Sequence, residues 1–259
     1  LGDVYKRQPL ESALLKKADK IIVSSPPYLA TSKPLAEISG KCAVIPLGID
    51  DRFGDQTPND STVIPEYAGK TSPKTAGILN VLAIGRTTHY KGFHILLRAI
   101  AQTEGITLDL VGHGELTPSL ERLKDSLNLS ARVRFHGLLD DNAKDKLLSR
   151  CDCLCLPSTD RTESFGIVLL EAMSAAKACV VSDVEGSGMS WLVEDGKTGL
   201  VTPNNDVDGL TNALCRLRDD PALATRLGLK GRQKFLATLT INASAEAIQD
   251  LYHHLTSTP

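Results

Sequence analysis

Two groups of charged residues in this sequence have the types and the spacing needed to bind an anion. In the segment IGRTTHYKG, Arg86 and Lys91 stand five residues apart, between an apolar run and a segment of helical spacing. Arginine offers a planar fork of donors and lysine a mobile point charge, so the pair could converge with the positive end of a helix on a diphosphate. Cations in loops are often only solvated, and this pair therefore needs support from other residues.

The second group is the pair Glu163 and Glu171 in the segment ESFGIVLLEAM. Glu163 is predicted to lie in a loop, and Gly166 allows a ligand to approach the backbone closely. A helix that begins near Phe165 would direct its free N–H groups above the sheet, and Glu171 would lie less than two turns into that helix. Each glutamate alone is more often an ordinary helix-end residue. Together with the two cations, they predict a cleft in which carboxylates accept hydrogen bonds from sugar hydroxyls and helix amides face a phosphate.

Glycines at the ends of predicted strands form a third and weaker set. Gly112, Gly114 and Gly137 would let the backbone approach a ligand, although glycine at a strand end is most often only part of a turn. His113 and His136 lie in the same loops. One histidine in each loop, without a carboxylate that orients it, does not make an acid–base pair. Both are therefore interpreted as turn or rim residues.

The elements that must position these residues alternate regularly from residue 78 onward. Strands are predicted at the apolar runs 80–85, 108–112, 133–135, 153–157, 179–182 and 199–202. Helices are predicted at 91–102, 116–127, 142–149, 206–218, 221–237 and 243–256. Asp206 and Asn242 are predicted N-caps, and Pro221 suits a first helical turn. This order predicts an α/β fold with a doubly wound, parallel, six-stranded Rossmann-like sheet.

The chain is predicted to divide into unequal segments. These are a non-native start at 1–8, the tail of a truncated N-terminal domain at 9–50, a linker at 51–76, the sheet domain at 77–238 and a C-terminal helix at 239–259 that packs back towards the N-terminal domain. The start is set aside because LGDVYKRQ resembles translated adapter sequence and the first residue is Leu1 rather than Met. The linker is inferred from its Pro, Ser, Thr and Asp content.

Composition narrows the classes of function. The formal net charge of -2 and the pI of about 6.3 show no basic excess, so no nucleic-acid partner is expected. No apolar run is long enough to span a bilayer. The six cysteines have no repeated spacing, and Cys151, Cys153 and Cys155 fit a reduced strand buried on both faces better than a metal site. A cytoplasmic location is therefore expected.

The charged segments resemble glycosyltransferase family 4 in their order and spacing. The resemblance rests on Arg86 and Lys91, on Gly137 after Phe135, and on the segments ESFGIVLLEAM and DGKTGLVTPNND. It implies a retaining enzyme of the two-domain GT-B fold, of which this chain holds the C-terminal half and a remnant of the N-terminal domain. It further implies transfer of a hexose from a nucleoside diphosphate sugar to a glycan or lipid-linked acceptor, for synthesis of a polysaccharide or lipopolysaccharide-type glycan.

The resemblance also implies a role for each site residue. Arg86 and Lys91 would hold the diphosphate of a UDP-, GDP- or ADP-sugar, and with Glu163 they are the predicted catalytic residues. The predicted donor-binding residues are Gly85, Gly112, Gly137, Leu138, Phe165, Gly166, Ile167 and Glu171. Glu163 and the backbone at 165–167 would meet the sugar and the distal phosphate, Glu171 the ribose hydroxyls, and the backbone at 137–138 the base. No metal or other cofactor is expected, because cations and helix dipoles can replace a metal ion.

Two departures from the family pattern concern the end of a helix and the choice of donor. Where the family commonly has Gly-x-Pro after the paired-glutamate helix, this chain has Ala176, Lys177 and Ala178. If Ala176 occupies a left-handed C-cap, it costs about 1 kcal/mol relative to glycine. The segment GSG at 186–188 replaces the paired glycine and glutamate of many members. It resembles the exopolysaccharide and O-antigen mannosyl- or rhamnosyltransferases.

Three other functions are weighed against this one. A GT-B epimerase or phosphorylase would use similar carboxylates. A non-catalytic Rossmann module that binds NAD is disfavoured, because no Gly-x-Gly-x-x-Gly pattern follows the first strand of the sheet domain. A purely structural domain would tolerate loss of Glu171. Because the family's acceptor site lies in the N-terminal domain, this chain alone is expected to bind donor with little or no turnover. Any peripheral membrane contact is expected through that missing domain.

Overall fold

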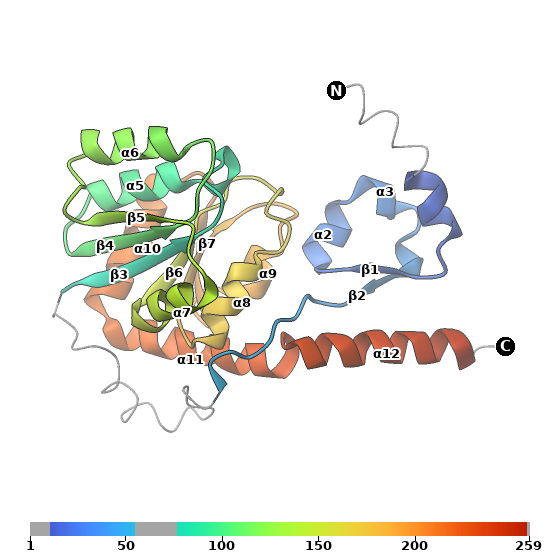
Figure 1. The fold of residues 1–259 in the computed structure, drawn as a ribbon. Coiled ribbons are helices and arrows are strands. Elements are labelled where there is room, and N and C mark those ends of the chain that lie inside the picture. Colours follow the sequence, from blue (N-terminus) through green and yellow to red (C-terminus); the bar gives the residue numbers. More distant parts are fainter. Residues whose placement is uncertain (1–10, 55–76, 258–259) are drawn as a thin grey trace.

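The computed structural model describes residues 11–54 and 77–257. A parallel sheet of six strands, in the order β5-β4-β3-β6-β7-β8, forms its larger part, and helices cover both faces of the sheet (Figure 1). A separate parallel pair consists of β1 (Ile21–Val23) and β2 (Cys42–Val44). The residues at 1–8, and most of the predicted linker, lie outside the described part of the chain.

The six predicted strands are all present, and each lies within two residues of its predicted bounds. They are β3 (Leu79–Ile84), β4 (Ile106–Val111), β5 (Val133–Gly137), β6 (Cys153–Leu156), β7 (Ala178–Asp183) and β8 (Gly199–Pro203). From β3 the chain builds outward through β4 to β5, then returns to β6 on the other side of β3 and builds outward again. The strand order therefore reverses between β3 and β6, and α/β sheets bind ligands at the carboxyl ends of strands at such a point.

Two helical layers enclose two hydrophobic cores. One face carries α5 (Phe93–Ala101), α6 (Thr117–Ser126) and α10 (Val207–Asp219). The other carries α7 (Asp141–Arg150), α8 (Ile167–Ser174) and α9 (Met189–Leu192). The long helix α11 (Pro221–Thr238) contributes side chains to both cores. Within the described residues, no helix combines the length and the hydropathy needed to cross a bilayer.

Strand β6 is buried on both faces, as its alternating cysteines and leucines indicate. Cys153 and Cys155 face the core under α5, whereas Leu154 and Leu156 face the core under α8. All six cysteines of the chain are free thiols. Burial raises the pKa of the Cys151 thiol to about 12, so this group stays protonated at neutral pH and is unsuited to nucleophilic or metal chemistry.

Helix ends follow the sequence with two exceptions. The side chain of Asp206 caps α10 and Pro221 begins α11, as predicted. The prediction that Asn242 caps the last helix is wrong, because α12 (Ile241–Ser257) already includes it. Thr240 takes this role: its Oγ1 accepts a hydrogen bond from the N–H of Ala243 at 3.2 Å. Thr240 also forms an isolated parallel β-bridge with Ile49.

The paired-glutamate helix α8 begins and ends at left-handed residues. It starts at Ile167, two residues later than predicted, because Gly166 has a φ of 84° and cannot continue a right-handed helix. At its other end Ala176 has a φ of 54°, the left-handed conformation considered from the sequence. The N–H of Lys177 donates to the C=O of Ala172 at 2.9 Å, which completes a Schellman ending without glycine.

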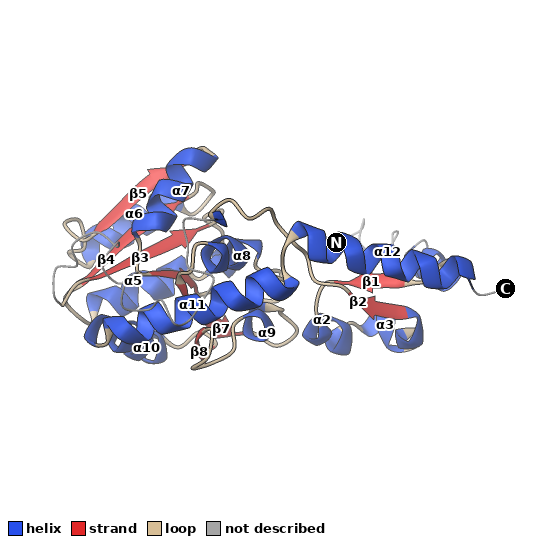
Figure 2. Cartoon of the chain, turned by 90° about the horizontal axis from the view of Figure 1, so that it is seen from below, coloured by secondary structure: helices blue, strands red, loops and turns tan. Residues whose placement is uncertain are grey.

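The smaller part of the structure packs against the last helix. It contains β1, β2, the short helices α2 (Pro26–Thr31) and α3 (Lys33–Ala36), and the 3-10 turn η1 (Ser39–Lys41). Helix α12 leaves the large domain and runs beside β1 and β2 in both views (Figures 1 and 2). Ser244 on α12 donates a hydrogen bond to the C=O of Pro46 at 2.7 Å. One helix thus connects the two parts of the structure.

Candidate functional site

A cavity of about 360 Å³ lies at the carboxyl ends of β3 and β6, where the strand order reverses. Four elements supply its walls: the turn after β3, the loop between β6 and α8, the first turns of α8, and α7. The segment after β2 also reaches it. The lining residues are Leu47, Ile84, Gly85, Lys91, Lys144, Thr162, Glu163, Ser164, Phe165, Gly166, Ile167, Val168 and Glu171.

Lys91 and Glu163 form an ion pair in this cavity. Their side chains are only 10% and 12% exposed, so the charges are largely removed from water. Ser158 donates a further hydrogen bond to the Glu163 carboxylate at 3.2 Å. Removing one partner of such a pair leaves a buried charge uncompensated, which is strongly destabilising. The structure therefore holds a cation and a carboxylate side by side in a cavity of ligand-binding type.

Glycines make the close packing around Lys91 feasible. A Cβ on Gly85 would lie 3.0 Å from Cε of Lys91, so the missing side chain leaves the path of the lysine open. Gly92, at the start of α5, has a φ of 67°, and a Cβ there would lie 1.9 Å from the C=O of Pro157. The turn after β3 is thereby pressed against the end of β6. Gly92 belongs to the predicted motif, but its function as the contact between the two loops could not be inferred from the sequence.

A second loop supports Glu163 from behind. Ser187, which is fully buried, donates from its hydroxyl to the backbone C=O of Glu163. The N–H of Gly188 donates to the C=O of Ser164 at 2.8 Å. The segment EGSG, which was only weak evidence of a site in the sequence, therefore holds the backbone of Glu163, the predicted catalytic carboxylate, in place.

The start of α8 offers unpaired amides to the cavity. Gly166, the residue before the helix, gives no side-chain cap, and no described residue accepts a hydrogen bond from the N–H of Ile167 or Val168. Phe165 is buried in the core and anchors the loop, whereas Ile167 is half exposed. Because the N-terminus of a helix carries positive partial charge, these amides are suited to an anion.

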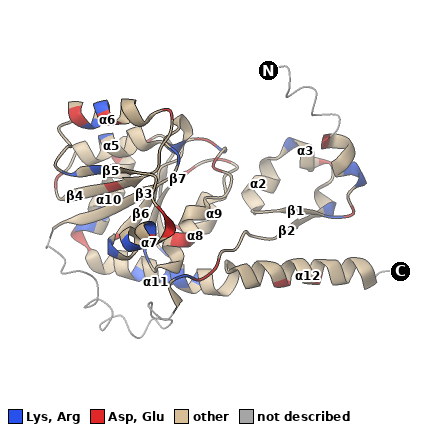
Figure 3. Ribbon diagram, viewed as in Figure 1, with Lys and Arg blue, Asp and Glu red and all other residues tan. Residues whose placement is uncertain are grey.

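Glu171 lies in the same cavity and has two basic neighbours. Its Oε1 is 2.9 Å from Nζ of Lys144 on α7 and 3.4 Å from Nη2 of Arg52. Basic and acidic segments accordingly lie together at α7 and α8 (Figure 3). Neither Lys144 nor Arg52 was predicted to belong to the site. The sequence placed Lys144 on a helix, but which face of that helix meets Glu171 depends on how α7 docks.

Residues 72–234 match the family whose description is Glycosyl transferases group 1. The chain belongs to this family. It is 32% identical over 245 residues to O-antigen chain mannosyltransferase C of Escherichia coli, an alignment that covers 95% of this chain and 63% of that protein. It is 32% identical over 234 residues to the D-rhamnosyltransferase WbpZ of Pseudomonas aeruginosa, with 90% and 58% covered.

A solved structure shares the fold. Sucrose-phosphate synthase (tll1590) from Thermosynechococcus elongatus superposes with a TM-score of 0.80 and 29% sequence identity, over 98% of this chain and 63% of that one. The match confirms the predicted α/β architecture. The chain spans 63% and 58% of the length of these two curated relatives, respectively.

Among the residues predicted to be catalytic, Arg86 lies apart from the others. Its side chain is 72% exposed and is 3.4 Å from the carboxylate of Glu115, which is 55% exposed. The expected convergence of Arg86 with Lys91 is therefore absent from this structure. The physical reason is that Lys91 turns inward to the buried Glu163, whereas Arg86 stays in water opposite a different carboxylate.

The predicted glycines at strand ends differ in how closely other atoms pack around them. A Cβ on Gly112 would lie 1.9 Å from the C=O of Gly85, so Gly112 is required where β3 and β4 approach each other. Gly137, with a φ of 64°, has open space where its Cβ would be, and Leu138 is 80% exposed. Neither Gly137 nor Leu138 is among the residues that line the cavity.

The interpretation of His136 as a histidine without an orienting carboxylate is wrong. Its Nε2 lies 2.7 Å from Oδ1 of Asp109, with side-chain exposures of 27% and 31%. The carboxylate comes from the neighbouring strand β4, where the pairing with β5 shifts register, and so was not visible in the histidine's own loop. The pair lies outside the residues that line the cavity.

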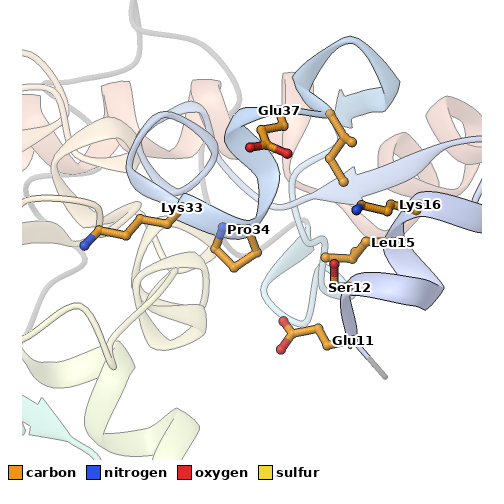
Figure 4. Close-up of a pocket in the computed structure, with 8 residues that line it drawn as sticks. Glu11, Ser12, Leu15, Lys16, Lys33, Pro34 and Glu37 are labelled. Atoms are coloured by element: carbon orange, nitrogen blue, oxygen red, sulfur yellow. The ribbon is translucent and has the colours of Figure 1, made fainter. Parts of the chain in front are cut away.

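A second cavity, of about 310 Å³, lies in the smaller part of the structure (Figure 4). Its lining includes Glu11, Leu15 and Lys16 on one side and Lys33, Pro34 and Glu37 on the other. Lys33 is directed away from Glu11 and Glu37 in Figure 4. Since its charged groups do not converge, this cavity is a weaker candidate than the one at β3 and β6.

Proposed function

We propose that the whole protein transfers a sugar from a nucleoside diphosphate sugar to a glycan or lipid-linked acceptor, and that this chain binds the donor. The observation that carries the proposal is the cavity in which Lys91, Glu163 and the uncapped start of α8 meet. Membership of the group 1 family supports it. The residues that match family 4 support the finer assignment to that family and to transfer with retention of configuration.

The site residues would act mainly on charge. In the proposed complex, the free amides at 167–168 and the ammonium of Lys91 face the diphosphate. Lysine has three donors, so Lys91 can keep its contact with Glu163 while it binds a phosphate oxygen. Preorganised donors of this kind stabilise the negative charge that develops on a departing diphosphate, and we propose that no metal ion is needed. Retention further requires that the acceptor hydroxyl attack from the face that the diphosphate leaves.

The relatives suggest the class of glycan. Proteins named for mannosyl and rhamnosyl transfer match 95% and 90% of this chain. We therefore propose a mannosyl or rhamnosyl donor and an O-antigen-like or related polysaccharide product. Both relatives are named transferases, which favours transfer over epimerisation or phosphorolysis. The six free thiols fit a reducing, cytoplasmic compartment.

Calorimetric titration of the chain with UDP-, GDP- and ADP-sugars tests the proposal. We expect one nucleotide series to bind with a Kd of 1 mM or tighter, and Lys91→Met to weaken it about tenfold or more, the effect of losing one charge-assisted contact. Lys197→Met is the control, because Lys197 is 75% exposed and, among the described residues, forms an ion pair with Glu194 alone. The double variant Lys91→Met/Glu163→Gln removes both charges. It therefore separates the loss of the Lys91 contact from the destabilisation that an unpaired Glu163 carboxylate would cause. Absence of binding by all three series would overturn the proposal.

A further inference from the structure

The two oxygens of the Glu171 carboxylate have different surroundings. Oε1 accepts a hydrogen bond from Lys144 at 2.9 Å and lies 3.4 Å from Nη2 of Arg52. Oε2 has no hydrogen-bond or ion-pair partner among the residues that the structure describes. Two cations thus hold one oxygen in place and leave the other for a ligand.

The two cations are themselves fixed. Nζ of Lys144 lies 3.0 Å from Asp141, and Arg52 lies 3.4 Å from Asp141 and 3.1 Å from Asp145. The side chains of Lys144 and Glu171 are 17% and 15% exposed, so water screens their attraction less than at an open surface. Burial lowers the pKa of Lys144, but hydrogen bonds to Glu171 and Asp141 outweigh it and hold that pKa above its ordinary value. Lys144 is therefore charged at neutral pH.

The charges of this group leave Lys144 poorly suited to the diphosphate. Its ammonium already contacts two carboxylates, whereas Lys91 contacts one and stands beside the free amides of α8. A free carboxylate oxygen accepts hydrogen bonds but repels a phosphate. The unpartnered Oε2 of Glu171 is therefore matched to hydroxyl groups of the donor.

We propose that Lys144 and Arg52 are positioning residues, which hold Glu171 so that its free oxygen accepts hydrogen bonds from the ribose hydroxyls of the donor. This inference deepens the proposed function and rests on it. Arg52 comes from the segment that joins the smaller part of the structure to the sheet domain. That segment consequently belongs to the donor site as well as to the connection between the two parts.

The discriminating measurement compares ribonucleotides with nucleotides that lack the ribose hydroxyls. The full chain is titrated with UDP, GDP and ADP and with their 2′,3′-dideoxy forms. We expect wild type to bind one ribonucleotide about tenfold more tightly than its dideoxy form, the effect of a hydrogen bond to a charged group. In Lys144→Met the ribonucleotide should lose most of this advantage, while the affinity for the dideoxy form stays unchanged. Arg52→Met should produce the same change to a smaller extent, because its contact with Glu171 is longer.

Further variants separate a positioning role from an effect on folding. Lys146→Met changes the same residue type on an exposed position of the same helix and should leave both affinities unchanged. Lys144→Arg should restore the ribose preference in part. Glu171→Gln should remove the preference, and adding Lys144→Met to it should have no further effect on the ratio. Thermal melting of every variant reports whether the fold is intact, and Arg52→Met carries the test of positioning if Lys144→Met unfolds.

The possible results distinguish this inference from the proposed function. If wild type binds none of the six nucleotides, the donor site itself is refuted, and the inference falls with it. If wild type binds a nucleotide but shows no preference for the ribose form, or if Lys144→Met weakens both forms equally, donor binding stands and the positioning role is refuted. Loss of the ribose preference alone supports it.

Discussion

Lys91 and Arg86 show how burial decides the role of a charge. Both stand in one short motif, yet the Lys91 side chain is 10% exposed and that of Arg86 is 72% exposed. An ion pair between exposed groups, such as Arg86 with Glu115, contributes only about 0–1 kcal/mol. A diphosphate in the cavity can therefore draw Arg86 away from Glu115 at little cost, whereas Lys91 is already in place.

This difference in exposure predicts different affinities for two alanine variants. Arg86→Ala should weaken binding of the nucleoside diphosphate about tenfold, because a bidentate, charge-assisted contact is lost. Glu115→Ala should leave the affinity unchanged or make it tighter, since it releases Arg86. Calorimetric titration of both variants measures the effect. Equal affinity of Arg86→Ala and wild type would show that Arg86 does not reach the diphosphate.

At the scale of single residues, the sequence allowed us to predict candidate site residues within a motif, but not contacts between residues from distant segments. Lys91, Glu163 and Glu171 could be recognised because each lies in a short motif after an apolar run. Arg52 could not, because its contact with Glu171 depends on how the chain returns to the sheet domain. The partner of His136 was missed for the same reason, since it comes from the neighbouring strand.

At the scale of elements, the site depends on contact between the turn after β3 and the end of β6. Gly92 fits against the C=O of Pro157, and the N–H of Thr159 donates to the C=O of Tyr90 at 2.7 Å. These contacts bring Lys91 to Glu163. The site therefore requires close packing of the turn after β3 against the end of β6, as well as the charged side chains.

Replacing Gly92 tests this dependence. A left-handed conformation costs alanine roughly 1–2 kcal/mol. Gly92→Ala should lower the free energy of unfolding by more than this amount, because its Cβ would also clash with the C=O of Pro157. Gly137→Ala is the matched control: its φ is 64°, but no atom lies within 4 Å of the added Cβ. Urea denaturation compares the two variants. Equal losses of stability would mean that the two turns can separate freely.

The elements themselves were the most predictable level of the structure. The six strands could be predicted because the sequences of buried parallel strands are continuous apolar runs. Their ends, and the start of α8, depended on local backbone conformation. Gly166 delayed that helix by taking a left-handed conformation, and Thr240, which also bridges to Ile49, caps the last helix in place of Asn242. Neither effect is visible in residue type alone.

At the scale of the whole molecule, a partly buried ion pair fixes the connecting segment to the sheet domain. Arg232 on α11 is 1% exposed, and its two terminal nitrogens donate to Asp51 at 2.6 and 2.7 Å. The same guanidinium donates to the C=O of Ser174 at 2.8 Å, at the end of α8. Residues 51–54, the start of the predicted linker, are thus packed against the large domain.

The pair predicts a pH-dependent loss of stability. Hydrogen bonding to Arg232 holds the pKa of Asp51 below its ordinary value, so its contribution is complete above the unfolded-state pKa of about 3.9 and disappears as the pH falls through the lower, folded value. Asp51→Asn should cost on the order of 3 kcal/mol at pH 7, since it leaves Arg232 buried without its partner. The neighbouring exposed Asp50→Asn serves as control. Urea denaturation from pH 7 to 3.5 should show the difference shrinking below about pH 4, and a difference that persists unchanged would contradict this assignment.

The bridge between Ile49 and Thr240 has a consequence for the ancestry and engineering of the molecule. The N–H of Ile49 donates to the C=O of Leu239 at 3.2 Å, and the N–H of Ile241 donates to the C=O of Ile49 at 2.9 Å. The chain therefore enters and leaves the sheet domain at one point. A unit whose two ends meet can be exchanged as a cassette without stretching its host. Recombination at this point would exchange the sheet domain, with its proposed donor site, as one unit.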